Sequence, residues 1–268
     1  MNYQVGVRRS LYVLAVMFFF LSQGYAQKTR NRGSEDGDGG KQKVFVTAGP
    51  EVNLILPTDF GSDNRGFYGD TMAIFKPSVS FRLGGNVRFD FSKRFSLQTG
   101  LYYVQRVYNV EIGIADADHN GMTTRLAQQR LTYTGFEIPV MGLIYVQLGR
   151  NWFMNNLVGF SADFFPSSVQ DTAQGYRIYG GRYSWIVPSV KVAIGFEART
   201  NNAGYFYLGG QFHRPLIPIF EGLVQKQDQA GSSLWGSNSV SADVSGTYFS
   251  IDFKYFLPPG KKNKFMDR

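Results

Sequence analysis

Long segments of alternating apolar and polar residues follow one another from Lys43 to Leu257. Side chains of a β-strand point to opposite faces in turn, so a period of two predicts strands with one apolar and one polar face. The expected strands cover about 43–56, 78–91, 95–108, 136–148, 152–163, 185–199, 205–215 and 246–257. These eight segments are closer in length to a membrane-spanning strand, roughly 9–11 residues, than to a soluble one of roughly 5–6.

The connections between these segments alternate in length. Short turns are expected at 92–94, 149–151 and 200–204, and long loops near 57–72, 110–130, 164–184 and 216–245. An even number of antiparallel strands puts both termini at the short-turn end, and short periplasmic turns with long external loops are typical of outer-membrane proteins. We therefore predict an all-β fold, an eight-stranded antiparallel transmembrane up-and-down β-barrel over residues 43–257.

The polar face distinguishes a membrane barrel from a secreted soluble one. A face in water would be rich in Lys and Glu, whereas this one is mostly Ser, Thr, Asn, Gln, Gly and Tyr. We expect it to fill the lumen, where its few charges would neutralise one another. Those charges are Arg82, Arg88, Asp90, Glu137, Lys191, Glu197, Arg199, Asp252 and Lys254. As further support, aromatic girdles at the two membrane interfaces are expected from Tyr145, Trp152, Trp185, Tyr205, Tyr255 and Phe256.

The amino-terminal residues predict export. Arg8 and Arg9 precede the short apolar block Leu11–Leu21, and a small-x-small site ends at Ala26. This order predicts a cleaved signal peptide over 1–26. Together with the predicted barrel it predicts location in the cell outer membrane. Residues 27–42 hold no apolar side chain and are predicted to be a disordered periplasmic leader, and residues 258–268 a basic periplasmic tail.

Composition excludes several classes of site and partner. The chain has no cysteine, which rules out disulfide scaffolds, Cys-based zinc sites and thiol nucleophiles. Its formal net charge of +8 is partly in the tails, where attraction to anionic lipid is expected rather than binding of nucleic acid.

The run FEIPVMGLIYVQL, residues 136–148, contains Glu137 and Pro139 within an otherwise apolar segment. Both residues have the lumen-facing parity, so Glu137 is expected to pair with an interior Lys or Arg. Pro139 must forgo one ladder hydrogen bond, which predicts a local bulge or an unpaired carbonyl.

The longer segment YTGFEIPVMGLIYVQLGRNWFMNNLVGFSADF, Tyr133 to Phe164, resembles the strand-turn-strand signature of the Bacteroidota outer-membrane β-barrel family often called PorT-like. Residues 94–103 (RFSLQTGLYY) and 247–256 are similar to two further recurrent pieces of that family. The resemblance implies an outer-membrane barrel and, by analogy with some relatives, an association with protein secretion. The basic tail after Phe256 departs from the many outer-membrane barrels that end on a terminal aromatic residue.

No constellation in the sequence predicts chemistry, and we expect a non-enzymatic protein with no catalytic, cofactor-binding or metal site. The two histidines are His119, in a long loop, and His213, expected at the rim near a strand end. The motif DADHNG, Asp116–Gly121, matches the opening of a calcium loop, but Ala127 stands where the bidentate Glu belongs. A plain turn is therefore favoured there, with a calcium site as the alternative.

A wide pore is also not expected, because eight strands leave a lumen that side chains can fill. Large inward residues such as Arg82, Tyr102 and Met141 predict negligible conductance. Function would then reside on surfaces, and the external loops carry apolar residues in FEGLVQ (220–225) and SSLWG (232–236). We expect these residues to be exposed and to mark a binding site, with packing over the barrel mouth as the alternative.

We favour a scaffold or accessory component of an envelope assembly, with outer-membrane lipid and envelope or secretion proteins as partners. The alternative is a stand-alone barrel for adhesion, ligand binding or envelope stability. A small pore and a lipid-modifying enzyme are less favoured.

Overall fold

The computed structural model describes residues 45–58, 64–92, 94–116, 121–200, 203–226 and 239–258. All of them belong to one compact unit, residues 42–268. The predicted signal peptide, the leader and, apart from residue 258, the basic tail lie outside the described residues. In the part of the chain that is described, no helix is long and apolar enough to cross a membrane.

The regular secondary structure of the described residues consists of β-strands. The strands are β1 Phe45–Leu56, β2 Arg65–Tyr68, β3 Thr71–Asp90, β4 Phe95–Ala115, β5 Met122–Gln147, β6 Trp152–Phe164, β7 Val169–Ala173, β8 Tyr176–Arg182, β9 Ile186–Thr200, β10 Gly204–Pro215, β11 Phe220–Lys226, β12 Ser239–Val244 and β13 Tyr248–Phe256.

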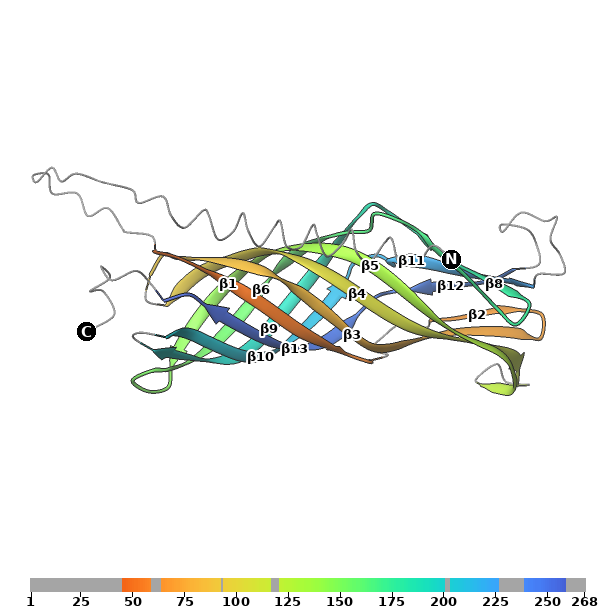
Figure 1. Ribbon diagram of the computed structural model, residues 1–268, viewed down its shortest axis with the longest axis horizontal. Helices are drawn as coiled ribbons and strands as arrows, with labels where there is room; N and C mark the ends of the chain where they lie inside the picture. Colours follow the sequence, from red (N-terminus) through yellow and green to blue (C-terminus); the bar gives the residue numbers. More distant parts are fainter. Residues whose placement is uncertain are drawn as a thin grey trace, which may run out of the picture. The chain divides into compact units, whose positions relative to one another are not determined.

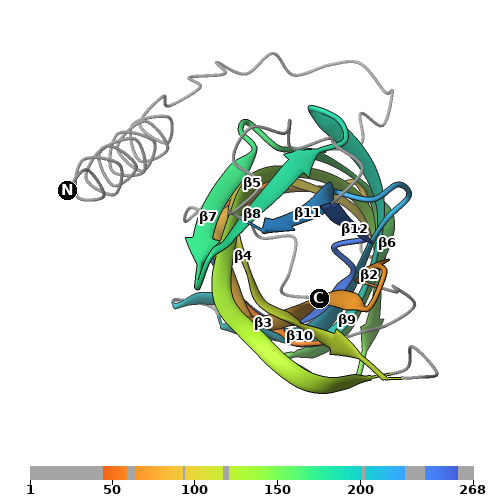
Figure 2. The ribbon, with the colours of Figure 1, turned by 90° about the vertical axis from the view of Figure 1, so that its right-hand side faces the viewer.

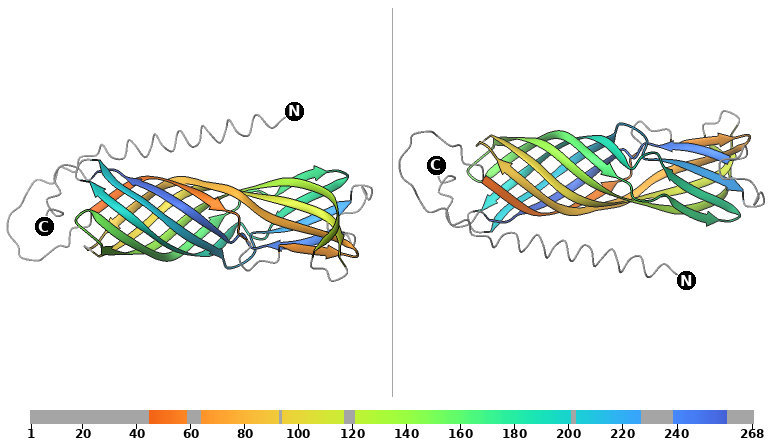
Figure 3. Two further views of the ribbon diagram at one scale, coloured as in Figure 1. Left: turned by 90° about the horizontal axis from the view of Figure 1, so that it is seen from below. Right: turned by 90° about the horizontal axis from the view of Figure 1, so that it is seen from above.

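Eight of these strands close into a ring. Their order is β1-β13-β10-β9-β6-β5-β4-β3, and β1 also pairs with β3, so the sheet has no open edge at this level (Figures 1 and 3). Every pairing in the ring is antiparallel. The eight strands are those predicted from the alternation, and the predicted barrel is confirmed.

The apolar face of each ring strand points outward. In β1, Val52 and Leu54 are exposed while Glu51 and Asn53 are buried inside. β6 has 13 residues, so at a tilt of about 45° and about 3.3 Å per residue it rises about 28 Å, enough to cross an apolar band of about 25 Å. These apolar side chains can remain exposed because they face lipid and not water.

The predicted aromatic girdles are only partly correct. Trp152 and Trp185 are 55% and 61% exposed at the two ends of the band. Tyr145, Tyr205 and Phe256 are instead buried, because they share the inward parity of their strands and fill the lumen.

Pro139 causes neither the bulge nor the unpaired carbonyl expected. The β4–β5 register is the same on both sides of it, Thr99 opposite Val140 and Tyr102 opposite Glu137. The ladder is interrupted between these two pairs without slipping, and the Thr99 hydroxyl donates to the Pro139 carbonyl at 2.8 Å. The Thr99 side chain thus supplies the hydrogen bond that the Pro139 carbonyl does not receive from the β4 backbone.

The long connections contain ordered strands, which the sequence did not predict. β12, β11, β8 and β7 form a second, four-stranded sheet. β7 packs against β5, and β12 packs against β2 and β3. We call this region the cap: β2, β7, β8, β11 and β12 with residues 71–78 of β3, 107–115 of β4 and 122–135 of β5. Figure 2 views the cap end, with the second sheet arranged around the same axis as the long strands.

The cap has an apolar core of its own. Phe220 is completely buried and its ring contacts those of Phe75, Tyr108 and Tyr133, with centroids 6.0, 5.3 and 4.7 Å away. FEGLVQ is therefore not an exposed binding loop: this segment is β11, paired on both sides, and Phe220 and Val224 pack into the cap core, as the alternative of packing over the barrel mouth predicts. The second predicted loop motif, SSLWG, lies outside the described residues.

The residue pattern of β5 changes where the strand passes from water into lipid. Along its outward face the residues change from Arg130, Thr132 and Thr134 to apolar ones beginning at Phe136, while the inward face, which carries Leu131 and Tyr133 in the cap, places the buried charge of Glu137 at the same level. The outward face thus becomes apolar at the level where the inward face joins the ion-pair network. The outer boundary of the lipid band therefore lies near Phe136.

Two carboxylates face each other on the cap surface. Glu221 and Asp243 are directly opposite in the β11–β12 pair, and Asp243 accepts a hydrogen bond of 2.7 Å from the Tyr183 hydroxyl. Partial burial, and then the charge of Asp243, raise the pKa of Glu221. The hydrogen bond to Asp243 is the main cause that raises the pKa of Tyr183 to about 12.

We expect this pair to make the cap less stable as pH rises. The folded cap holds the Glu221 proton more tightly than the unfolded chain, so stability falls as pH increases from the ordinary glutamate pKa through the raised one. Glu221→Gln should remove most of this slope and stabilise the cap by about 0.2–1 kcal/mol at pH 7. Hydrogen exchange of the β11–β12 amides, corrected for intrinsic rates, measures this; equal slopes in variant and wild type would refute it.

Candidate functional site

Among the described residues, those that line the lumen of the ring include equal numbers of basic and acidic side chains. Strand alternation places each of them on an inward face, and the ring brings them together. The six basic residues are Arg82, Arg88, Arg106, Lys191, Arg199 and Lys254, and the six acidic ones are Glu51, Asp90, Glu137, Asp163, Glu197 and Asp252. With His213 neutral, the interior carries no net charge, the condition under which buried ions are tolerated.

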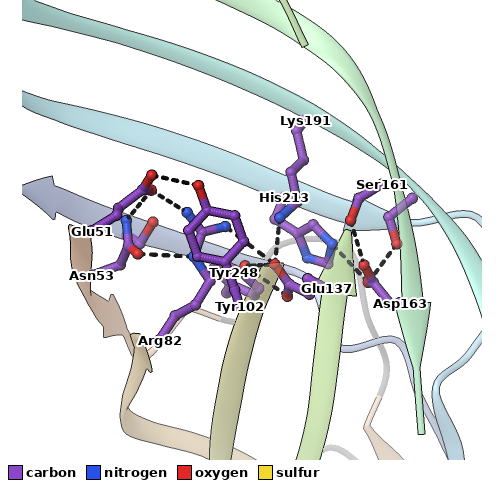
Figure 4. Close-up of polar contacts among 12 residues, drawn as sticks. Glu51, Asn53, Arg82, Tyr102, Glu137, Ser161, Asp163, Lys191, His213 and Tyr248 are labelled. Carbon is purple, nitrogen blue, oxygen red and sulfur yellow. Dashed lines mark hydrogen bonds and ion pairs between the residues drawn. The ribbon is translucent and has the colours of Figure 1, made fainter. Parts of the chain in front are cut away.

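Glu137 is the centre of this network (Figure 4). Its Oε2 accepts from Arg82 Nη1 at 3.2 Å and from Lys191 Nζ. Its Oε1 accepts from Arg106 Nη2 at 3.1 Å and from the Tyr248 hydroxyl at 3.0 Å. The predicted pairing of Glu137 with interior cations is thus confirmed, and three cations from β3, β4 and β9 meet at one carboxylate from β5.

Glu51 is a second acceptor on the other side of Arg82. Arg82 Nη2 lies 2.5 Å from Glu51 Oε1, and the Tyr102 hydroxyl donates to Oε2 at 2.7 Å. Lys254 Nζ is 3.6 Å from the same Oε2. Asn53 accepts from Arg82 Nε at 2.9 Å, and the guanidinium stacks over the Tyr102 ring at 4.2 Å. Arg82 thereby joins β1 to the central carboxylate.

Asp163 and His213 form a third node, on the cap side of the lumen. Asp163 accepts hydrogen bonds of 2.7 Å from the hydroxyls of Ser161 and Ser189, and its Oδ2 lies 2.8 Å from His213 Nε2. His213 was predicted at the rim, which is wrong. It is completely buried because β10 turns it inward, and its ring packs on Tyr248 with centroids 4.5 Å apart.

This third node does not have the geometry of an acyl-transfer site. Both serine hydroxyls donate to Asp163, so neither is activated by His213 as a nucleophile must be. That the protein is non-enzymatic stays a prediction.

Ligand atoms of Glu137, Asp163 and His213 lie within 4.8 Å of one another, close enough to hold a metal ion. The neighbouring charges oppose this use. Lys191 and two arginines already neutralise Glu137, and a divalent cation at the same place would face their repulsion. We interpret the cluster as a node of the ion-pair network.

The short-turn end of the lumen is filled by a separate group centred on Glu197. Arg88 Nη2 lies 2.8 Å from Glu197 Oε2, and Arg199 Nε lies 2.6 Å from Oε1. The Arg88 guanidinium lies 3.8 Å from the centroid of the Phe256 ring, and that of Arg199 lies 4.0 Å from the centroid of the Phe153 ring. Charge pairing and aromatic stacking together occupy this end of the barrel.

Most of the charged residues predicted to pair do so. Asp90 and Asp252 are exceptions among the described contacts, since serine hydroxyls donate to both, from Ser96 and Ser250. Sequence reasoning did not include Glu51, Arg106, Asp163 and His213 in the network. Their signal was available, because each shares the inward parity of the polar residues beside it.

The predicted turn at Asp116–Gly121 is described only at its ends, and residues 117–120, with His119, lie outside the described residues. The Asp116 amide donates to the Gly121 carbonyl at 3.0 Å. Ala127, which stands where the bidentate Glu of a calcium loop belongs, is buried in the cap core.

A closed ring of eight strands, apolar outside and ion-paired inside, defines a small outer-membrane β-barrel. The family model described as "Outer membrane protein beta-barrel domain" matches residues 26–221, and the chain belongs to this family. No curated protein matches the sequence.

Three solved structures are similar to this chain. OprG from Pseudomonas aeruginosa is 14% identical, with a TM-score of 0.45 over 80% of this chain and 95% of its own. The outer membrane protease OmpT from Escherichia coli is 9% identical, with a TM-score of 0.34 over 80% and 96%. The beta domain of the Bordetella autotransporter BrkA is 12% identical, with a TM-score of 0.30 over 78% and 98%.

Proposed function

We propose that this outer-membrane barrel is a non-enzymatic scaffold or accessory component of an envelope assembly, and that it acts through the surface of its cap. One observation carries the proposal: the interior is filled at both levels. Ion pairs around Glu137 and Glu197 occupy the membrane part, and the apolar side chains around Phe220 occupy the cap. A binding partner would therefore have to contact the outer surface of the protein.

The cap suits this role because it is ordered. Binding through a preformed sheet avoids most of the entropy cost of ordering a loop on association. The strand pairs β8–β11 and β11–β12 hold in register the residues that the sequence predicts as loops. The apolar side chains around Phe220 pack the second sheet against the cap residues of β3, β4 and β5.

The resemblance to PorT-like barrels suggests protein secretion as the process that the assembly serves, and this part of the proposal rests on analogy. The alternative, a stand-alone barrel for adhesion, ligand binding or envelope stability, uses the same surface with a different partner.

Photo-crosslinking in native outer membranes tests the proposal. A crosslinking amino acid at Thr124 or Ser241, both exposed on the cap, should give a discrete adduct with one envelope protein. The same group at Phe160, which is 68% exposed on the lipid face, is the matched control and should give lipid and abundant neighbours. Cap positions that yield only the Phe160 products would refute the accessory role, and adducts with an external ligand instead would favour the stand-alone alternative.

A further inference from the structure

The two groups of strands that form the cap carry different charge. The strands of the second sheet, β7, β8, β11 and β12, hold three basic and three acidic residues. The cap residues of β3, β4 and β5 hold three basic residues and one acidic residue, which are Lys76, Arg125, Arg130 and Glu111. We call these four residues the basic patch. Two positive charges are in excess there.

The cations of the basic patch are accessible from outside. The side chains of Lys76 and Arg125 are 46% and 54% exposed, and both pair with Glu111, at 2.7 and 3.2 Å. Arg130 is exposed too, and no acidic side chain among the described residues forms an ion pair with it. Lys76 and Arg130 are both paired with Asn109, one on each side, so their backbones are two strand spacings, about 10 Å, apart. Two long cationic side chains at this spacing can contact one anionic group between them.

An aromatic row lies on the same three strands at the boundary of the lipid band. It consists of Phe81 on β3, Tyr103 on β4 and Phe136 on β5, and the centroid of the Tyr103 ring is 6.2 Å from that of Phe81 and 5.9 Å from that of Phe136. Phe81 and Phe136 are exposed on the outer surface. Aromatic side chains at this level mark the interface between hydrocarbon and headgroups. An acyl chain that contacts this row therefore has its headgroup on the side of the basic patch.

The height of the basic patch above the aromatic row suits a lipid headgroup. Arg130 lies six residues beyond Phe136 along β5, which is about 14 Å higher at a tilt of about 45°. The headgroup layer is about 5–8 Å thick on each side of the hydrocarbon, and the long side chains of Lys76 and Arg130 can return their charges to it. Thr132 and Thr134 lie on the outward face between the two levels and offer hydroxyl donors to headgroup oxygens.

We propose that the basic patch and the aromatic row together bind a phosphomonoester lipid of the outer leaflet. A phosphomonoester carries about 1.5–2 negative charges at pH 7, which matches the two positive charges in excess. The Arg130 guanidinium donates to two phosphate oxygens, and Lys76 contacts the same group from the other side. The acyl chains lie against the aromatic row. The inference goes beyond the proposed function, because its ligand is a lipid and not an envelope protein.

Native mass spectrometry of the full chain, released from phosphatidylcholine nanodiscs that contain a titrated fraction of phosphatidic acid, measures lipid retention. Phosphatidic acid, a phosphomonoester, should bind about fivefold more tightly than phosphatidylglycerol, which carries a single charge. Arg130→Gln should weaken binding of phosphatidic acid about fivefold, and Lys76→Gln combined with Arg130→Gln about 25-fold. Arg177→Gln, on β8 in the second sheet, is the matched control and should change binding less than about twofold.

Fluorescence quenching locates the bound lipid. The chain has no cysteine, so Leu54→Cys, opposite Phe81 in the β1–β3 pair, and Leu208→Cys, on β10, each provide a single labelling site. Both leucines face lipid and are 46% and 58% exposed, and the lone exposed cation Arg214 lies further along β10 from Leu208. Phosphatidic acid with brominated chains should quench a label at position 54 at least about twofold more than brominated phosphatidylcholine does, and both lipids should quench equally at position 208. Arg130→Gln should abolish the difference at position 54.

Four results would overturn the inference. Phosphatidic acid could be retained no better than phosphatidylglycerol, Arg130→Gln could bind it as the wild type does, or its quenching could be enhanced equally at positions 54 and 208. Displacement of phosphatidic acid by inorganic phosphate would make the basic patch a site for soluble anions instead. Arg130 is exposed, so Arg130→Gln should fold like the wild type, and the gel mobility of the folded barrel checks this.

Discussion

Replacing Glu137 by glutamine should destabilise the barrel by about 3–5 kcal/mol, because it leaves three buried cations facing a neutral amide of the same size. Arg82, Arg106 and Lys191 have side chains that are nearly or completely buried, so water cannot compensate. Urea unfolding in lipid vesicles, followed by the change in gel mobility between folded and unfolded barrel, measures the difference.

The matched control is Glu111→Gln. Glu111 also pairs with two cations, but their side chains are 46% and 54% exposed, so its loss should cost only about 0–1 kcal/mol. Comparable losses for the two variants would show that the lumen network contributes no more than a surface ion pair does.

Phe220→Ala should unfold the cap locally while the membrane ring stays closed. Removing a buried phenylalanine costs about 3–5 kcal/mol, and the three rings around Phe220 join the second sheet to β3, β4 and β5. We expect fast hydrogen exchange and protease cleavage in β8, β11 and β12, with protection retained in β6, β9 and β10.

Phe160→Ala serves as the comparison, because this phenylalanine is exposed to lipid on β6 and has no part in the cap core. It should leave the protection of β8, β11 and β12 unchanged. If Phe220→Ala unfolds the ring together with the cap, the two levels are one cooperative unit and the separation that we describe is wrong.

The ring could be predicted from sequence because alternation carries the same information in lipid as in water: which residues share a face. Glu51, Arg82 and Glu137 all have inward parity, and parity needs no knowledge of distant contacts. Their pairing could not be predicted, because Glu137 and Tyr248 are 111 positions apart and meet only once the ring closes with its particular register.

The cap could not be predicted because its strands give weak signals. β7 and β8 have five and seven residues, and β8 ends in Gly180, Gly181 and Arg182, which favour a loop. The inward face is also apolar in the cap, whereas it carries charges at the membrane level. On β5, inward Tyr133 lies in the cap and inward Glu137 lies at the membrane level. An apolar run such as FEGLVQ therefore suggests an exposed binding loop. In the folded protein water surrounds the cap, so Phe220 and Val224 of this run are buried in its core.

We propose that function resides on the surface of this barrel because its interior is filled along its length. Single-channel recording of the purified protein in planar lipid bilayers tests it most directly. The ion pairs of Glu51, Glu137 and Glu197 and the aromatic stacking at the short-turn end predict negligible conductance. Stable, large single-channel openings of the wild-type protein would contradict the claim.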